Sequence, residues 1–265
     1  MKAKHISLTM TSVCLVVFAL LLSTALPVSA QGAQAKDLVT KAVTAIGGEK
    51  AIQVFENFEG EGDIKVTYFG REMAGTIKLV RQGRKRYQKV KIAFGSREFL
   101  VTEAYDGKVT WRDMMGTLAD QPSLNNESDQ DHTVSLLIKK GVKYTMGKET
   151  EIEGKKAVGV VAEYKGKKTT FFFDKTNFTV LEIVFKDLYF GQKKIKESTE
   201  KRIRYQDYKK KDGIMFPHTT IFYEKGKKAV EVIFKKLTFN PKLLASLFQR
   251  PDKAPDLRFR AERYE

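Results

Sequence analysis

The sequence contains a single cysteine, Cys14, and it lies near the start of the chain. Beyond it there is no thiol for a disulfide, for a nucleophile or for a cysteine-ligated metal. Proline is scarce, with 6 residues in 265, and no Pro-, Ser- or Gly-rich linker divides the chain. We therefore expect one domain that depends on its hydrophobic core for stability.

The sequence also lacks the common catalytic signatures H-E-x-x-H, G-x-S-x-G, the P-loop and G-x-G-x-x-G. Beyond residue 30 there are two histidines, His132 and His218, and they lie far apart in the chain. Asp106 and Asp212 each precede a glycine and are best interpreted as turn residues. We expect that the protein is not an enzyme and that it has no cofactor and no bound metal. A catalytic pair of carboxylates that is close only in space cannot be found from the sequence.

The first 30 residues have the organisation of a secretory signal peptide. Lys2 and Lys4 form a basic start, an apolar run covers 13–22, and Val28-Ser29-Ala30 is a small-residue cleavage site. Cys14 precedes most of the apolar run, so it is not placed for lipid attachment. We expect cleavage near Ala30, a periplasmic protein, and a single domain over 31–265.

Positive charge is in excess, with 48 Lys and Arg against 32 Asp and Glu and a formal net charge of +16. An exported protein meets anionic lipid head groups rather than nucleic acid, so we expect the former as partners. The alternative, a solvated basic surface that serves solubility, stays open. The motif KGKK occurs twice, and its lysines are candidate head-group contacts: Lys165, Lys167, Lys168, Lys225, Lys227 and Lys228.

From residue 59 onward, apolar and polar residues alternate with a period of two between Gly-containing turns. This predicts a mainly β (α+β) protein with about ten or eleven antiparallel strands in one strongly curved sheet, a half-open barrel. An irregularity at Ile233 predicts a β-bulge. The residues expected on the inner side, as the lining of a lipid cavity, are Ile64, Val66, Tyr68, Ile77, Leu79, Val90, Ile92, Phe99, Val101, Val158, Val160, Phe171, Phe173, Leu181, Ile183, Phe185, Val230 and Val232.

Three short helices are expected near 36–55, 132–140 and 241–248. They are too small to fill the concave side of such a sheet, which predicts an apolar cavity for an acyl chain at about 0.8 kcal/mol per buried CH₂. A fully packed interior is the alternative. The polar segment 114–131 is expected to be a long loop, and with Leu136 and Leu137 of the following helix it is a candidate lid.

Several motifs occur together along 36–251. Ile46-Gly47-Gly48-Glu49 follows the first expected helix, and Tyr105-Asp106-Gly107 precedes Trp111. The last third contains DG-x-x-FP at 212–217, a strand pair, Asn240-Pro241 and Leu-Phe-x-x-Pro at 247–251. This arrangement resembles the outer-membrane lipoprotein-sorting superfamily, which includes the periplasmic lipoprotein carrier and its outer-membrane receptor.

The resemblance implies a periplasmic carrier or binding protein for lipoprotein acyl chains or other lipids. Its implied partners are the acyl chain and a membrane receptor or anionic membrane surface, and we expect a monomer. Two alternatives stay open. The first is a periplasmic sensor of the same fold without transport activity. The second is an envelope hydrolase, which a cluster of polar, pKa-perturbed side chains in the pocket would favour.

Overall fold

The structure is a computed structural model that describes residues 28–252, apart from 69, 96, 122–132 and 191–195. At 28–30, 68, 94, 187–190 and 196–198 it describes the backbone alone. The expected signal peptide, 1–30, thus lies almost entirely outside the described residues. The backbone of 28–30 belongs to the first described helix, α2 (Val28–Ala45).

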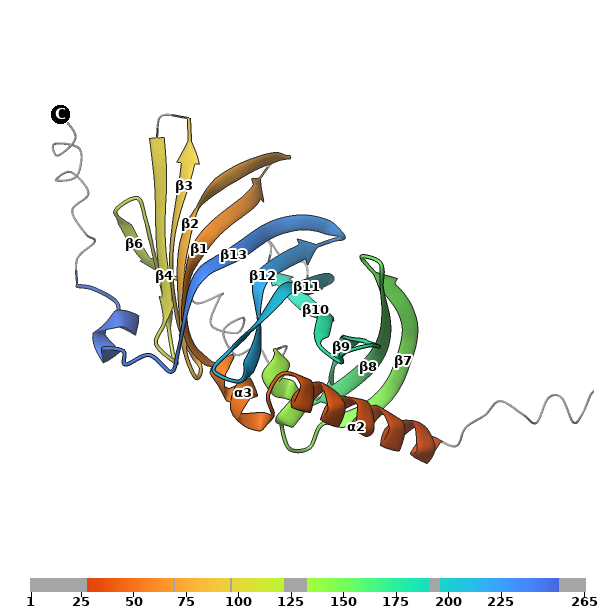
Figure 1. Cartoon of the computed structure of the whole chain (residues 1–265). Helices are drawn as coiled ribbons and strands as arrows, with labels where there is room; N and C mark the ends of the chain where they lie inside the picture. Colours follow the sequence, from red (N-terminus) through yellow and green to blue (C-terminus); the bar gives the residue numbers. More distant parts are fainter. Residues whose placement is uncertain (1–27, 69, 96, 122–132, 191–195, 253–265) are drawn as a thin grey trace, which may run out of the picture.

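Within this part of the chain, thirteen antiparallel strands form one strongly curved sheet (Figure 1). The order β6-β5-β4-β3-β2-β1-β13-β12-β11-β10-β9-β8-β7 makes β6 and β7 the two edges, so the sheet stays open. The mainly β, half-open architecture expected from the sequence is confirmed. The strands are β1 (Asn57–Tyr68), β2 (Arg71–Gln82), β3 (Lys85–Phe94), β4 (Arg97–Tyr105), β5 (Thr110–Met114), β6 (Thr117–Asp120), β7 (Lys143–Ile152), β8 (Lys155–Tyr164), β9 (Lys167–Asp174), β10 (Val180–Phe190), β11 (Lys196–Lys211), β12 (Ile214–Glu224) and β13 (Lys227–Phe239).

Five of the described hairpins turn through two residues that both have positive φ. The central pairs are Met115-Gly116, Glu153-Gly154, Lys165-Gly166, Asp212-Gly213 and Lys225-Gly226, with φ of 50–55° at the first residue and 73–86° at the glycine. This is the conformation of a type I′ turn, whose twist matches that of the strands it joins. The two KGKK motifs and the DG motif are therefore hairpin turns, as the sequence predicts.

The inner face of the sheet is defined here as the face that packs against α2, α3 (Glu49–Val54) and the 3₁₀ turn η2 (Val134–Ile138). In α2, Ala35, Val39, Ala42 and Ile46 recur at three- and four-residue spacing and are buried. The helix lies along β7 and β8, while α3 lies against β1 and η2. The main core is therefore between these helices and the inner face.

Close strand approaches and bulges accompany the curvature. A side chain at Gly62 would collide with the backbone carbonyl of Ile233, and one at Gly75 with the carbonyl of Lys91. The β1–β13 ladder has a bulge opposite Glu61 and Gly62, so Lys235 of β13 has no residue of β1 directly opposite it. The bulge predicted in this strand is present, but Ile233 itself pairs regularly with Asp63.

The sequence-based strand count of ten or eleven is wrong by two or three, and the strands it missed are the edges. β6 lies inside the segment expected to be a long loop, 114–131, of which 122–131 lies outside the described residues. β7 reads KYTMGKETEI, which has no clean apolar alternation. An edge strand has one neighbour and carries polar residues that discourage pairing with other chains, so its hydrophobic signal is weak.

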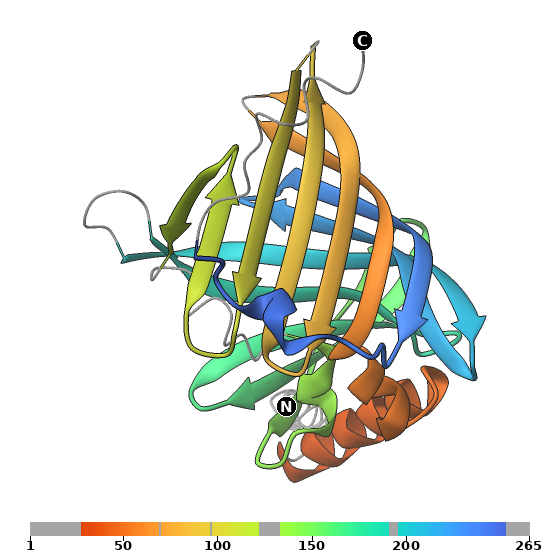
Figure 2. The same cartoon turned by 90° about the vertical axis from the view of Figure 1, so that its left-hand side faces the viewer.

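The helix expected over 241–248 is reduced to one 3₁₀ turn, η3 (Ala245–Phe248). It does not cover the inner face, because 240–250 crosses the opposite, outer face of β1–β5 (Figure 2). Of its apolar residues Phe248 is fully buried, whereas Leu244 is 79% exposed. The Trp111 indole Nε1–H donates to the Phe248 carbonyl oxygen at 3.0 Å and holds the segment in place.

Candidate functional site

Most of the residues expected to line a cavity face inward, and many are packed. The inward residues that belong to the core or pack against it are Ile64, Val66, Ile77, Leu79, Val90, Val158, Val160, Phe171, Phe173, Ile183, Phe185, Val230 and Val232. Around β7–β10 this core is dense, and Val160, Phe171, Phe173 and Ile183 are fully buried. That half of the inner face is filled by protein side chains.

On β2–β5 the inner face carries an apolar row that becomes more exposed as it leaves the core. The register aligns Ile77, Val90, Val101 and Met114 across four neighbouring strands. Ile77 is 7% exposed, Val90 and Val101 are intermediate, and Met114 is 51% exposed. With an interstrand distance of about 4.8 Å, the row is roughly 14 Å long. This row, hereafter the apolar row, is a candidate surface for a hydrocarbon chain.

A second aligned pair, Ile92 and Phe99, lies one step further along the same face. Phe99 is 42% exposed and Ile92 is partly buried. These two residues and Val101 were all expected on the inner side and lie there. For Tyr68 the structure describes the backbone alone, so its expected side-chain position lies outside the description.

Leu181 was expected inside, and this is wrong. The β9–β10 ladder has a bulge between Val180 and Glu182. Because the bulge adds one residue, Val180 and Ile183 both face the main core. Leu181 instead joins Ile152, Ala157 and Phe172 in a small cluster on the outer face.

Beyond the apolar row, toward α3, the inner face of β2–β5 becomes polar. One aligned row contains Gln88, Glu103 and Arg112, and the next contains Arg81 and Arg86. Glu103, 2% exposed, accepts hydrogen bonds from Arg86 at 2.8 Å and from Arg112 at 2.8 and 2.5 Å. Gln88 also donates to it at 3.2 Å. The alternation of apolar and polar residues in the sequence did not indicate this cluster, because finding it requires the register of four strands.

Two hollows in the described part of the chain lie on the outer face. One, of about 430 Å³, is bordered by Glu61, Asp63, Lys78, Lys89 and Lys91, with Lys235 and Lys236 of β13. The other, of about 180 Å³, lies beside Glu153, Leu181 and Arg204. Neither is the apolar cavity expected from the sequence.

The two candidate lid residues are part of the core. Leu136 and Leu137 of η2 are 3% and 4% exposed and pack with the helices and the inner face. The Tyr144 hydroxyl of β7 donates to both of their carbonyl oxygens, at 3.1 Å each. Burial raises the pKa of this phenol to about 12, which keeps it a hydrogen-bond donor at ordinary pH. A lid role for η2 remains a prediction.

Replacing Tyr144 with phenylalanine should loosen η2 without changing the fold. The variant removes the hydroxyl donor from both carbonyls, although that of Leu136 keeps the Lys139 N–H at 3.3 Å, and we expect the free energy of unfolding to fall by about 1 kcal/mol. Amide hydrogen exchange over 134–138 should accelerate. Tyr164→Phe is a matched control, because its ring under Lys139 is kept. Unchanged exchange in Tyr144→Phe would show that the hydroxyl does not hold η2.

The lysine-rich turns lie at one end of the meander. The turns β8–β9 and β12–β13 are on the same rim, because both follow even-numbered strands in a sheet of consecutive hairpins. Lys228 pairs with Glu231 at 2.6 Å, Lys168 approaches Glu163 at 3.9 Å, and Lys165 lies over the Tyr164 ring. Contact with anionic head groups at these turns remains a prediction.

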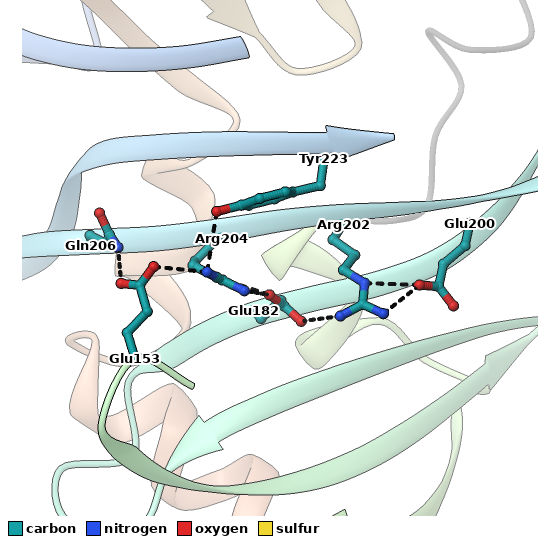
Figure 3. A network of polar contacts seen from close by, with 7 residues as sticks. All are labelled: Glu153, Glu182, Glu200, Arg202, Arg204, Gln206 and Tyr223. Atoms are coloured by element: carbon teal, nitrogen blue, oxygen red, sulfur yellow. Dashed lines mark hydrogen bonds and ion pairs between the residues drawn. The ribbon is translucent and has the colours of Figure 1, made fainter. Parts of the chain in front are cut away.

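An ion-pair network covers the outer face of β10–β12 (Figure 3). Glu182 accepts from Arg204 at 2.7 and 3.0 Å and lies 3.6 Å from Arg202. Arg204 also donates to Glu153 at 2.8 Å and to the Tyr223 hydroxyl at 3.2 Å. Burial opposes the charge on Arg204, but these hydrogen bonds outweigh it and raise its pKa. The network joins the β7–β8 turn to the middle of the sheet.

Neither a metal-binding group of His, Cys, Asp and Glu nor a helix long and apolar enough to cross a membrane is found among the described residues. His218 lies on β12, where its Nδ1 is 3.2 Å from the carbonyl oxygen of Phe216. His132 lies outside the described residues.

A comparison with protein-family models gives no match, and a comparison with curated protein sequences gives no significant match. Solved structures do match. A protein domain from Vibrio parahaemolyticus described as outer membrane lipoprotein-sorting aligns at 11% identity, with a TM-score of 0.51, over 82% of this chain and 97% of that one. A DUF1329 family protein from Desulfovibrio piger aligns at 13% identity, with a TM-score of 0.50, over 83% and 97%.

The chain therefore has the fold of the outer membrane lipoprotein-sorting domains, as the sequence motifs indicated. The likeness covers almost the whole of each matched chain. At this identity the likeness shows a shared fold and does not by itself assign a function.

Proposed function

We propose that the protein is a periplasmic carrier or binding protein for lipids or lipoprotein acyl chains. The observation that carries this proposal is the apolar row, which runs from the core at Ile77 to the half-exposed Met114. Exposed apolar surface on the concave side of an open sheet is costly in water and is recovered when a hydrocarbon chain covers it. The shared fold supports the same conclusion.

The remaining helical cover is consistent with this proposal. The helices α2 and α3 and the turn η2 lie at one end of the inner face and contact β1, β7 and β8 (Figure 1). The segment 240–250, which the sequence placed on the inner face, covers the outer face instead (Figure 2). Less of the concave side is therefore filled than three inner helices would fill. In this proposal an acyl chain lies along the apolar row, over the inner face of β2–β5.

Native mass spectrometry of the protein purified from the periplasm of its source tests the proposal. We expect a population whose mass exceeds that of the chain by one lipid or one acylated protein. A fluorescent fatty acid should bind the stripped protein and be displaced by unlabelled lipid. A bare mass together with no binding of the fluorescent fatty acid would contradict the proposal and favour the sensor alternative.

A further inference from the structure

We propose that Arg81 and Arg86 bind the oxyanion head group, a carboxylate or a phosphate, of an amphiphile whose hydrocarbon tail lies along the apolar row. This inference rests on the proposed function, because it assigns the charged end of the same ligand. The charged end of the ligand would lie on the inner face of the sheet, toward α3, and not at the lysine-rich turns on the rim.

Both arginines have side-chain hydrogen-bond donors for which the described residues supply no acceptor. No hydrogen bond or ion pair joins the Arg81 side chain to another residue in the described ranges. Arg86 uses one terminal nitrogen to reach Glu103, but its Nε is buried and has no partner among those residues. Buried N–H groups in native proteins are nearly always paired, so an unpaired one favours an acceptor that comes from outside the chain.

The two arginines also carry positive charge that their neighbours do not balance. Arg81 and Arg86 lie directly opposite each other on β2 and β3, and like charges in that position destabilise a sheet. Burial and the Arg86 charge both lower the pKa of Arg81, and they outweigh the opposite effects of Tyr205 and Glu56. Glu103 is the one carboxylate in the cluster, and it is shared by Arg86 and Arg112. Positive charge remains in excess, and an incoming anion would neutralise it.

The chemistry and the placement of the two arginines both suit an oxyanion. Guanidinium groups bind carboxylate and phosphate through paired, charge-assisted hydrogen bonds. Arg81 lies four residues from Ile77 on the same strand and the same face, which is about 13 Å at 3.3–3.4 Å per residue. Between them lies the row of Leu79, Gln88 and Glu103. The tail of a ligand whose head group is bound at Arg81 would therefore cross this row and then reach the apolar row.

The test compares ligands that share a chain length and differ at one end. A fatty acid, a lysophosphatidic acid and a fatty alcohol are each titrated against the bound fluorescent fatty acid to measure displacement. The pH is kept well above the pKa of a carboxylic acid. Wild-type protein should bind one or both acids about 10- to 100-fold more tightly than the alcohol. Arg81→Gln and Arg86→Gln should abolish that preference and leave alcohol binding unchanged. Whichever acid is preferred identifies the head group.

Controls separate this inference from the proposed function. Arg250→Gln, on the outer face, should keep the preference. Arg81→Lys keeps the charge and should keep part of the preference, which serves if the glutamine variants do not fold. Equal binding of acids and alcohol by wild type would overturn the inference and leave the proposed function standing. The inference would also be overturned if changing the six turn lysines to glutamate abolished the preference for acids while changing the arginines did not. Binding of none of the three ligands would overturn both.

Discussion

Replacing Met114 with glutamate should weaken fatty-acid binding by about 10- to 100-fold. In wild type the side chain ends the apolar row and is 51% exposed, so a bound tail would cover it. Each lost CH₂ contact is worth about 0.8 kcal/mol, and covering a carboxylate without a partner costs about 2 kcal/mol or more. Titration of a fluorescent fatty acid measures the change.

The fold should survive this substitution, because surface changes away from packed sites usually alter the free energy of unfolding by less than about 0.5 kcal/mol. Val109→Glu is the matched control. Val109 is 41% exposed but lies in the β4–β5 turn, outside the apolar row, so binding should be unchanged. Met114→Leu should bind as wild type does. Equal weakening in Val109→Glu would attribute the effect to net charge, and an unaffected Met114→Glu would exclude the apolar row as the binding surface.

Replacing Glu182 with alanine should lower the free energy of unfolding by about 3 kcal/mol. The Glu182 side chain is 3% exposed, and it is the carboxylate shared by Arg202 and Arg204 (Figure 3). Removing one partner of a buried ion pair leaves the other charge in a poorly solvated position. Arg204 is 19% exposed and keeps Glu153, which places the expected loss at the lower end of the range for buried pairs. Urea denaturation measures it.

Glu200→Ala provides the control within the same network. Glu200 binds the same Arg202, at 2.6 Å, but its side chain is 41% exposed. Solvent and salt screen such a pair, so we expect a loss below about 1 kcal/mol. If both substitutions cost the same, the burial of Glu182 is not what makes the network stabilising. Fatty-acid binding should be retained in both variants, since the network is on the outer face.

The sequence predicted the strand pairs in the middle of the sheet because their signals are local. Alternation marked Ile64, Val66, Ile77 and Val90, and Asp212-Gly213 marked its turn through the positive φ that glycine permits. The same local rules fail at a bulge. One extra residue at Leu181 moves that side chain to the other face, and no feature of its immediate neighbours signals it.

The candidate site needed the assembled sheet. Arg81, Arg86, Glu103 and Arg112 are separated by up to 31 positions in the chain, and the register of β2–β5 places them together. From sequence each was an ordinary charged residue in an alternating strand. The segment 241–248 shows the same limit, because its helical spacing of leucines gave no indication that it would cross the outer face in a mostly extended form.

By itself, the sequence determined the class of fold, the turns and the apolar faces, since these depend on residues within a few positions of each other. It also determined that stability comes from a cysteine-free core over the expected mature chain. Only the tertiary structure decided where the apolar face stays uncovered and which charges meet there. That choice depends on how thirteen strands align and which side each connecting segment takes, and both are set by contacts between distant parts of the chain.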